Sequence, residues 1–258
     1  MHAKKSLGQN FLKSAEAVRD IISAGTLSPE DTVVEIGPGK GVLTKKLLEQ
    51  AGKVIAIEKD TRLIPVLQEI FKEEINSRKL EIREEDILES DPKTFSSPYK
   101  IIANIPYYIT GALVRKFLST SHQPTRMVLL LQKEVAQRIV ARDKKESILS
   151  ISVKVYGTPK YINTVKAKYF SPEPKVDSGI LLIENISKDF FKNISEDRFF
   201  EIIKTGFAHK RKMALGNLKE LFSAEILENA FLQAHIQKTA RAEDIMLEQW
   251  YSLIKNIG

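Results

Sequence analysis

The stretch Thr32-Val33-Val34-Glu35-Ile36-Gly37-Pro38-Gly39-Lys40-Gly41 decides the fold that we predict for this chain. Its apolar first half predicts a buried strand over 32–36, and its glycines precede a predicted helix over 42–50. Glycine lets the backbone approach a bound molecule closely, and the amides at a helix N-terminus attract an anionic group. The stretch therefore predicts a ligand-binding turn, although a plain tight turn would use the same residues. A dinucleotide-binding turn is disfavoured, because Val42 stands where the third glycine of that motif would be.

Apolar runs and helical patterns alternate on both sides of this turn. Such alternation predicts a parallel sheet with right-handed crossovers, which is an α/β fold. Ser14 is a suitable N-cap for the first helix, and Pro65 is tolerated only in the first turn of its helix. The predicted strands are 32–36, 53–58, 80–84, 99–103 and 127–131, and the predicted helices are 15–23, 42–50, 61–75, 111–118 and 134–141.

The rest of the chain changes from strands to helices. Residues 148–156 fit a strand by propensity and a helix by the alternating architecture, and both remain open. Strand patterns at 161–167 and 179–183 are the last, and from Ser187 onwards only helical patterns occur. These patterns cover 196–207, 214–221, 224–230 and 247–255. We therefore predict two domains, residues 1–186 and residues 187–258.

The turn Asn104-Ile105-Pro106-Tyr107 follows the strand at 99–103 and carries the predicted chemistry. Its position is the carboxyl edge of the sheet, where open α/β folds bind their ligands. An amide oxygen, a backbone carbonyl before proline and a flat ring suit an amino group on an aromatic ring. Hydride transfer and hydrolysis fit poorly, because the turn offers no base, nucleophile or metal ligand. The pattern resembles the Asn/Asp-x-Pro-Tyr motif of methyltransferases that modify amino groups of nucleobases.

Composition limits the location and the partners of the protein. The 258 residues carry a net charge of +7, which favours a polyanionic partner. The chain has no cysteine and four scattered histidines, so we expect no disulfide and no metal site. It has no apolar run long enough for a membrane span and no apolar signal segment at its start. We expect a cytoplasmic protein.

The glycine turn and two later acids resemble the cofactor site of S-adenosylmethionine (SAM) methyltransferases. The spacing Glu-x-Gly-x-Gly-x-Gly from Glu35 to Gly41 resembles motif I of those enzymes. Glu58 ends the strand at 53–58, where it can accept hydrogen bonds from both ribose hydroxyls. Asp86 follows the next strand and can accept a hydrogen bond from the adenine amine. Ordinary surface acids are the alternative, but three such elements after consecutive strands disfavour it.

Six motifs in order resemble one family, the ribosomal RNA adenine N6,N6-dimethyltransferases of the KsgA/RsmA type. The resemblance covers nearly the whole chain. It implies a Rossmann-like methyltransferase sheet of seven strands, mostly parallel with one antiparallel, and a small helical C-terminal domain for RNA recognition. The motifs are Ser6-Leu7-Gly8-Gln9-Asn10-Phe11-Leu12, Val34-Glu35-Ile36-Gly37-Pro38-Gly39, Asn104-Ile105-Pro106-Tyr107, Leu131-Gln132-Lys133-Glu134-Val135, Phe170-Ser171-Pro172-Glu173-Pro174-Lys175-Val176-Asp177-Ser178 and Arg241-Ala242-Glu243.

The same resemblance implies the members of the site. For Asn10 the residues alone predict only a mobile tail. The family often has Asn where this chain has Tyr108. The implied SAM-binding residues are Gln9, Asn10, Leu12, Gly37, Gly39, Gly41, Glu58, Asp86 and Asn104, and the implied catalytic residues are Asn104, Ile105, Pro106, Tyr107 and Phe170.

Each of the implied catalytic groups has a stated role. Asn104 and the Ile105 carbonyl accept the two N–H bonds of the target amine, which aligns its lone pair with the methyl group. The resemblance implies that Tyr107 stacks on the extruded base and that Phe170 closes the other face. Packing in the core is the alternative for each of these two rings.

A basic run near the C-terminal end is the predicted RNA contact. Lys204, Lys210, Arg211, Lys212 and Lys219 fall between 204 and 219 without an acid. Lys210, Arg211 and Lys212 precede a helix, where the dipole disfavours cations and a phosphate partner would favour them. A solvated surface is the alternative. Lys175 is added to the expected RNA-binding residues by the resemblance.

Three functions fit these observations. The first is dimethylation of two adjacent adenosines in the 3′-terminal hairpin of 16S rRNA, with the small-subunit rRNA or an immature small ribosomal subunit as partner. The second is the related dimethylation of 23S rRNA that confers macrolide resistance. The third is a non-catalytic RNA-binding assembly factor on the same fold. Lys175-Val176-Asp177-Ser178 favours the first, and intact Asn104 and Glu58 disfavour the third. We expect a SAM-dependent enzyme that is monomeric and not bound to a membrane.

Overall fold

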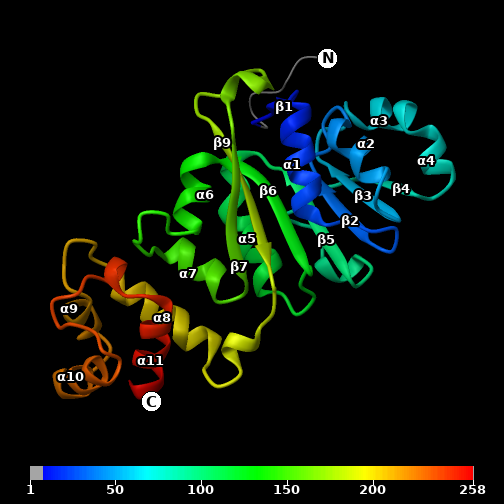
Figure 1. The fold of residues 1–258 in the computed structure, drawn as a ribbon. Coiled ribbons are helices and arrows are strands. Elements are labelled where there is room, and N and C mark those ends of the chain that lie inside the picture. Colours follow the sequence, from blue (N-terminus) through cyan, green and yellow to red (C-terminus); the bar gives the residue numbers. More distant parts are fainter. Residues whose placement is uncertain (1–7, 258) are drawn as a thin grey trace. The chain divides into compact units, whose positions relative to one another are not determined.

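The computed structural model describes residues 8–257, which divide into two compact units (Figure 1). The first unit holds residues 8–137 and 157–186, and the second holds residues 138–156 and 187–257. The chain therefore passes between the units three times. The change of pattern at Ser187 coincides with the third passage, whereas the two-domain prediction did not separate the segment 138–156.

The first unit is built on a seven-stranded sheet in the order β4-β3-β2-β5-β6-β9-β7. Strand β9 runs antiparallel to both β6 and β7, and the pairings among the other neighbours are parallel. The prediction of a mostly parallel sheet with one antiparallel strand is confirmed. The strands are β2 (Thr32–Ile36), β3 (Lys53–Glu58), β4 (Leu80–Glu84), β5 (Tyr99–Asn104), β6 (Arg126–Gln132), β7 (Thr158–Val165) and β9 (Ser178–Glu184).

The register of the central strands brings the predicted site residues to one level. Ile36 at the end of β2 pairs with Ile57 of β3 on one side and with Ala103 of β5 on the other. The residues that follow these three are Gly37, Glu58 and Asn104. They therefore lie side by side at the ends of their strands. The order of strands reverses at β2, and open α/β sheets bind ligands at such a point.

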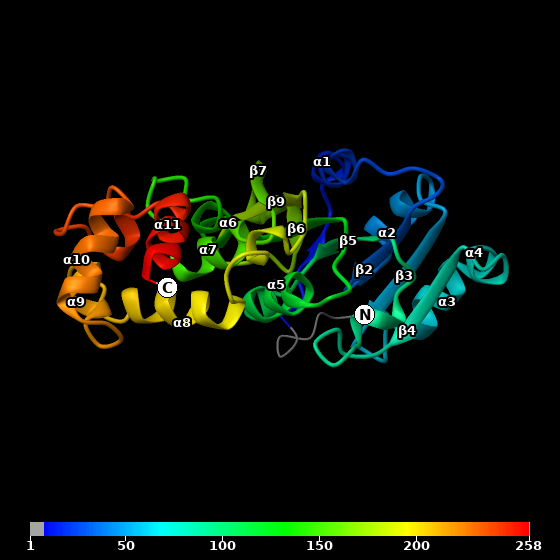
Figure 2. The ribbon, with the colours of Figure 1, turned by 90° about the horizontal axis from the view of Figure 1, so that it is seen from below.

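Helices cover both faces of the sheet, so most of its strands are apolar on both sides. Figure 2 shows α1 and α5 on opposite faces. Ser14 caps α1 as predicted, because its hydroxyl accepts a hydrogen bond from the Ala17 N–H at 3.1 Å. The helices of this part of the chain are α1 (Ala15–Gly25), α2 (Val42–Leu48), α3 (Ile64–Ile70), α4 (Lys72–Asn76), α5 (Thr110–Ser119) and α6 (Lys133–Ile139).

The predicted single helix over 61–75 is wrong, because the chain breaks it at Phe71. Phe71 has a non-helical backbone (φ −112°, ψ 31°), and its buried ring packs against Gly41. A Cβ on Gly41 would lie 2.5 Å from that ring, so the glycine provides the space. Pro65 is in the first turn of α3, as predicted. Packing between distant residues therefore overrides a continuous helical pattern here.

A small second sheet joins the start of the described chain to the loop after β7. Strand β1 (Phe11–Leu12) pairs antiparallel with β8 (Phe170–Ser171), and the Lys13 N–H donates to the Tyr169 carbonyl at 2.8 Å. The sequence did not predict this pairing. It fixes residues for which the sequence alone predicted a mobile tail.

The second unit is helical and includes the segment whose structure the sequence left open. Residues Ile148–Lys154 form helix α7, and Ser147 caps it in a reciprocal arrangement with Ser150. The other helices are α8 (Glu196–Gly206), α9 (Ala214–Leu218), α10 (Ala224–Gln233) and α11 (Leu247–Ile257). None of the helices among residues 8–257 is long and apolar enough to cross a membrane.

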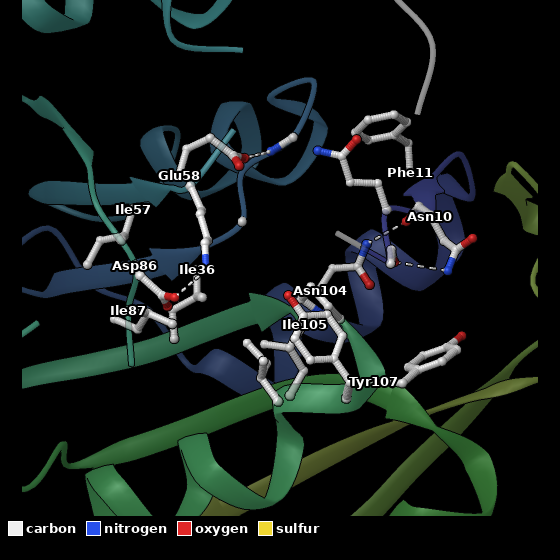
Figure 3. A pocket seen from close by; sticks show the side chains of 18 of the residues that line it. Asn10, Phe11, Ile36, Ile57, Glu58, Asp86, Ile87, Asn104, Ile105 and Tyr107 are labelled. Atoms are coloured by element: carbon white, nitrogen blue, oxygen red, sulfur yellow. Dashed lines mark hydrogen bonds and ion pairs between the residues drawn. The ribbon is translucent and has the colours of Figure 1, made fainter. Parts of the chain in front are cut away.

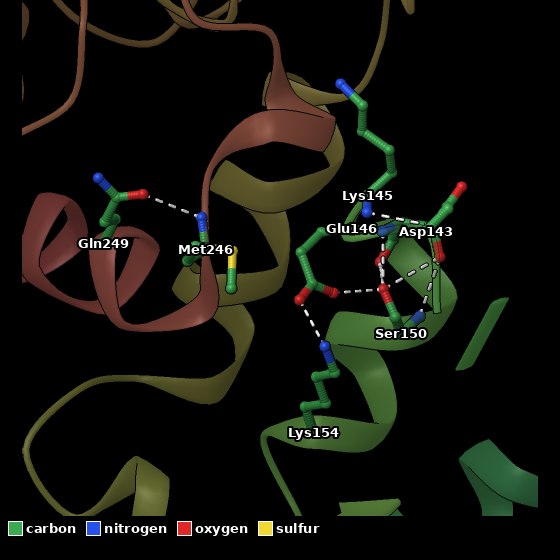
Figure 4. Close-up of polar contacts among 8 residues, drawn as sticks. Asp143, Lys145, Glu146, Ser150, Lys154, Met246 and Gln249 are labelled. Atoms are coloured by element: carbon green, nitrogen blue, oxygen red, sulfur yellow. Dashed lines mark hydrogen bonds and ion pairs between the residues drawn. The ribbon is translucent and has the colours of Figure 1, made fainter. Parts of the chain in front are cut away.

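Polar contacts hold the segment 138–156 within the second unit. Buried Glu146 accepts a hydrogen bond from the Ser150 hydroxyl at 2.6 Å and forms an ion pair with Lys154 (Figure 4). The Glu146 N–H donates to the Glu243 carbonyl at 2.8 Å, and Lys145 forms an ion pair with Asp244. The segment is therefore tied to residues about a hundred positions later in the chain.

Buried Glu35 on β2 makes the stability of the fold depend on pH. Burial, together with the nearby charge of Glu58, raises the pKa of the Glu35 carboxyl from 4.5 to about 8. Its Oε2 has no hydrogen-bond partner among the described residues. The native state therefore keeps a proton that the unfolded chain releases above pH 4.5. Stability is greatest below the unfolded pKa and declines as the pH rises towards 8.

We expect Glu35→Gln to remove this decline, since glutamine has the same shape and does not titrate. Urea unfolding at pH 5 and pH 8 measures the free energy of unfolding for both proteins. The wild type should lose several kcal/mol relative to the variant between these values, at about 1.4 kcal/mol for each pKa unit. Parallel pH profiles of the two proteins would contradict the assignment.

Candidate functional site

A cavity lies at the carboxyl ends of the central strands of the first unit, where the register places Gly37, Glu58 and Asn104 (Figure 3). It receives residues from the start of the described chain, from the glycine turn and from the turn after β5. The residues that line it are Gly8, Gln9, Asn10, Phe11, Ile36, Gly37, Gly39, Ile57, Glu58, Lys59, Glu85, Asp86, Ile87, Asn104, Ile105, Pro106, Tyr107, Tyr108 and Ile109.

Gly39 is required by the packing of the turn. It has φ +59°, a conformation that side chains disfavour, and a Cβ there would lie 2.9 Å from the Phe11 ring. The Lys40 ammonium lies 5.1 Å from the centre of the same ring. The start of the chain therefore closes directly over the glycine turn.

Glu58 lies at the cavity and is held by the backbone. Its Oε2 accepts a hydrogen bond from the Gly39 N–H at 3.2 Å, and its Oε1 accepts one from the Asp60 N–H at 2.8 Å. Burial raises the pKa of this carboxyl, and these two hydrogen bonds partly oppose the rise. Because Glu58 bonds to the turn after β2 and to its own loop, the carboxylate has a fixed orientation.

Asp86 lies at the cavity with a cationic partner that the sequence did not predict. Its Oδ2 forms an ion pair with the Lys59 ammonium at 2.6 Å, and its Oδ1 accepts the Leu88 N–H at 3.0 Å. Partial burial raises the pKa of Asp86, but Lys59 and the Leu88 N–H outweigh it, and the net pKa is lowered. Asp86 is therefore a charged acceptor at neutral pH.

Asn104 is oriented by the segment that carries Asn10. The Asn104 Nδ2 donates to the Asn10 backbone carbonyl at 3.1 Å (Figure 3). Among the described residues, Oδ1 of Asn104 has no hydrogen-bond partner. The amide therefore presents an acceptor beside the carbonyl of Ile105, which precedes Pro106.

Tyr107 and Tyr108 both line the cavity from the short 3₁₀ helix η3 (Tyr107–Ile109). The Tyr107 hydroxyl lies 2.9 Å from the Ser178 hydroxyl, and burial raises its pKa. Tyr108 is 64% exposed. The sequence marked Tyr108 only as a departure from the family, and the structure adds it to the cavity.

The buried carboxylate of Asp60, which forms an ion pair with the exposed Arg62, holds Gln9 at the rim. The Gln9 amide donates to the Asp60 carboxylate at 2.8 Å, and Arg62 forms two hydrogen bonds with the same group. The Arg62 guanidinium lowers the pKa of Asp60, so the carboxylate stays charged. Asp60 and Arg62 escaped the sequence analysis, although Asp60 stands two residues after Glu58.

Some predicted residues are not brought to the cavity. Leu12 and Phe170 are buried in the hydrophobic core of the first unit, and Gly41 supports Phe71 instead of lining the cavity. Phe170 is 2% exposed, so the alternative of core packing describes it in this structure. Its predicted contact with a base would require the ring to leave the core.

The predicted RNA-binding residues are at the surface and are not among the residues that line the cavity. Lys175, Lys210, Arg211 and Lys212 are exposed. Ser6 and Leu7 of the first quoted motif lie outside the described residues. Among the described residues, no three His, Asp or Glu side chains gather as metal ligands, and the expected absence of a metal stays a prediction.

Comparisons with known proteins identify the family. The family model described as ribosomal RNA adenine dimethylase matches residues 1–258. Ribosomal RNA small subunit methyltransferase A of Dehalococcoides mccartyi is 40% identical over 258 residues, which cover 98% of this chain and 88% of that protein.

Two solved structures have a similar fold. A dimethyladenosine transferase from Plasmodium falciparum has a TM-score of 0.77 and 27% identity, over 94% of this chain and 95% of that one. The 23S rRNA methyltransferase ErmE has a TM-score of 0.82 over 96% of this chain and 99% of that one, and its identity of 24% shows the fold alone. The family match and the 40% identical relative show that the chain belongs to the ribosomal RNA adenine dimethylases.

Proposed function

We propose that this protein transfers methyl groups from SAM to N6 of two adjacent adenosines in the 3′-terminal hairpin of 16S rRNA, forming N6,N6-dimethyladenosine. The observation that carries the proposal is the orientation of Asn104. Its Nδ2 is engaged by the Asn10 carbonyl, so its Oδ1 is directed to accept a hydrogen bond at the cavity. An acceptor held in this way suits an amine as the reacting group.

The residues around the cavity fit SAM. The glycine turn leaves space for a ligand beside the sheet edge, and Glu58 can accept from both ribose hydroxyls. Asp86 is charged and can accept from an adenine amine. Gln9, Asn10, Gly37 and Gly39 would complete the enclosure. When bound, SAM supplies an electrophilic methyl group on a sulfonium.

The protein's own groups would align the target amine. Adenine N6 is a poor nucleophile, because its lone pair is conjugated into the ring. In the first of the two transfers, Asn104 Oδ1 and the Ile105 carbonyl would each accept one N–H bond, which favours a pyramidal amine with its lone pair free. Tyr107 would stack on the extruded base, a contact worth about 1–3 kcal/mol. Proximity and orientation, without a general base, would supply most of the rate enhancement.

The small-subunit substrate is favoured over the large-subunit alternative. The relative named for the small subunit is 40% identical to this chain, whereas the 23S rRNA methyltransferase shares 24% identity and is a neighbour in fold. We also propose that the substrate is an immature small ribosomal subunit and that the protein acts as a cytoplasmic monomer. A net charge of +7 suits this polyanionic substrate.

The RNA contact outside the cavity is proposed for exposed cations. Lys210, Arg211 and Lys212 form a turn before α9 without a capping side chain, where a phosphate would offset the unfavourable helix dipole. Lys175 would contact RNA from the loop before β9 in the first unit. Such contacts give affinity without sequence specificity.

We expect wild-type protein to transfer labelled methyl groups from SAM to unmethylated small subunits, with N6,N6-dimethyladenosine identified by mass spectrometry. Asn104→Ala should lower the rate on the order of a hundredfold, because the aligned acceptor is lost. Asn163→Ala, at an exposed asparagine on β7, is the matched control and should keep the wild-type rate. Label in large subunits alone would overturn the proposed substrate, and transfer by Asn104→Ala at the wild-type rate would overturn the site.

We expect Lys210→Ala/Arg211→Ala to weaken binding to small-subunit rRNA and to reduce its salt dependence. Each lost phosphate contact lowers the slope of log affinity against log salt by about 0.7–0.9. Filter binding at several salt concentrations measures the slope. Lys45→Ala/Lys72→Ala removes two exposed cations of the first unit and serves as control. Equal slopes in the wild type and in Lys210→Ala/Arg211→Ala would exclude this turn from the RNA contact.

A further inference from the structure

The Tyr107 ring is held in place through its hydroxyl group. Its backbone lies in the 3₁₀ helix η3, outside the sheet, and its side chain lines the cavity. A ring in this position could rotate about two side-chain bonds, and stacking on a base requires one plane. The Tyr107 hydroxyl lies 2.9 Å from the Ser178 hydroxyl, and either group can donate. This hydrogen bond restricts the plane of the ring.

Ser178 is itself fixed by the sheet. It is the first residue of β9, fully buried, and it pairs with Gln132 of β6 on one side and Val165 of β7 on the other. The residue before it, Asp177, accepts hydrogen bonds from the Ala167 N–H at 3.1 Å and from Lys166 at 3.0 Å. The serine hydroxyl therefore projects from a backbone that is paired on both sides.

We propose that Ser178 is a positioning residue for methyl transfer, which holds the Tyr107 ring in the plane required to stack on the target adenine. The inference rests on the proposed function, because it assigns a partner to a residue of that site. Ser178 does not line the cavity, so it would touch neither the substrate nor the cofactor. It acts through the tyrosine hydroxyl.

A purely structural role would have a different signature. If Ser178 only satisfied a half-buried hydroxyl, Ser178→Ala would reduce stability and leave the turnover of the folded enzyme unchanged. Removing both hydroxyls in Ser178→Ala/Tyr107→Phe would then restore stability, because no buried polar group would lack a partner. If Ser178 positions the ring, the double variant regains stability and keeps the loss of turnover. Stability and turnover therefore separate the two roles.

The experiment measures kcat and KM for labelled methyl transfer to unmethylated small subunits, together with SAM affinity and thermal unfolding. Ser178→Ala and Tyr107→Phe should each lower kcat about three- to tenfold, as expected for one hydrogen bond. The double variant should be no slower than either single variant, because both substitutions break the same contact. SAM affinity should stay within about twofold, since the cofactor residues are untouched.

Two further variants provide reference values for the loss of kcat. Tyr107→Ala should lower kcat about ten- to a hundredfold, because it removes the stacking face itself. Tyr99→Phe is the matched control: it removes a buried tyrosine hydroxyl that donates to the His122 carbonyl at 2.8 Å, outside the cavity lining, and kcat should not change.

The outcomes distinguish this inference from the proposed function. Unchanged kcat in Ser178→Ala and Tyr107→Phe, with a reduced kcat in Tyr107→Ala, would overturn the role of Ser178 and leave the stacking role of Tyr107. Multiplicative losses in the double variant would also overturn it. Unchanged kcat in Tyr107→Ala would overturn both the stacking role of Tyr107 and the positioning role of Ser178.

Discussion

The parallel register of β2 with its two neighbours is the constraint on which the site depends. Ile36 is level with Ile57 and Ala103, so the glycine turn, Glu58 and Asn104 emerge side by side. These three come from the ends of three different strands, and no local pattern could hold them together. A slip of one residue in either pairing would point the strand's side chains to the opposite face and separate the two acceptors.

Residues 8–12 contact the residues at the strand ends and contribute to the lining of the cavity. Phe11 lies over Gly39, Gln9 bonds to Asp60, and the Asn10 carbonyl orients Asn104. Pairing of β1 with β8 fixes the same segment to the loop that leads to Ser178. The lining of the cavity and the orientation of the Asn104 amide therefore both depend on one short stretch of backbone. This coupling explains why Asn104 needs no charged partner to hold its amide.

Patterns in the sequence located the sheet because its central strands are buried on both faces and are continuous apolar runs. They failed where structure arises from distant contacts. The two-residue strands β1 and β8 have no periodicity, and the break at Phe71 follows from the space beside Gly41. The helix at 148–154 needed the cap at Ser147, which a strand-like composition concealed.

The candidate site was predictable to a similar extent. Glu58, Asp86 and Asn104 follow strands and were identifiable, since strand ends share one edge. Lys59 and Ser178 were not identifiable from the sequence. Their partners, Asp86 and Tyr107, are distant in sequence and come close only in the folded chain. Phe170 is a motif aromatic that packs in the core of this structure, and its contact with a base stays a prediction.

The three passages of the chain between the units have a consequence for synthesis. The sheet of the first unit is incomplete until β9 (Ser178–Glu184) has been synthesised, although its strands β2 to β6 are complete by Gln132. Residues 138–156 can form their contacts with the rest of the second unit only after the last third of the chain has been synthesised. The partners of Glu146 and Lys145 are Glu243 and Asp244. Each unit is made of two separate segments of the chain, so neither could be exchanged by recombination at a single position. The two units are therefore expected to be inherited together.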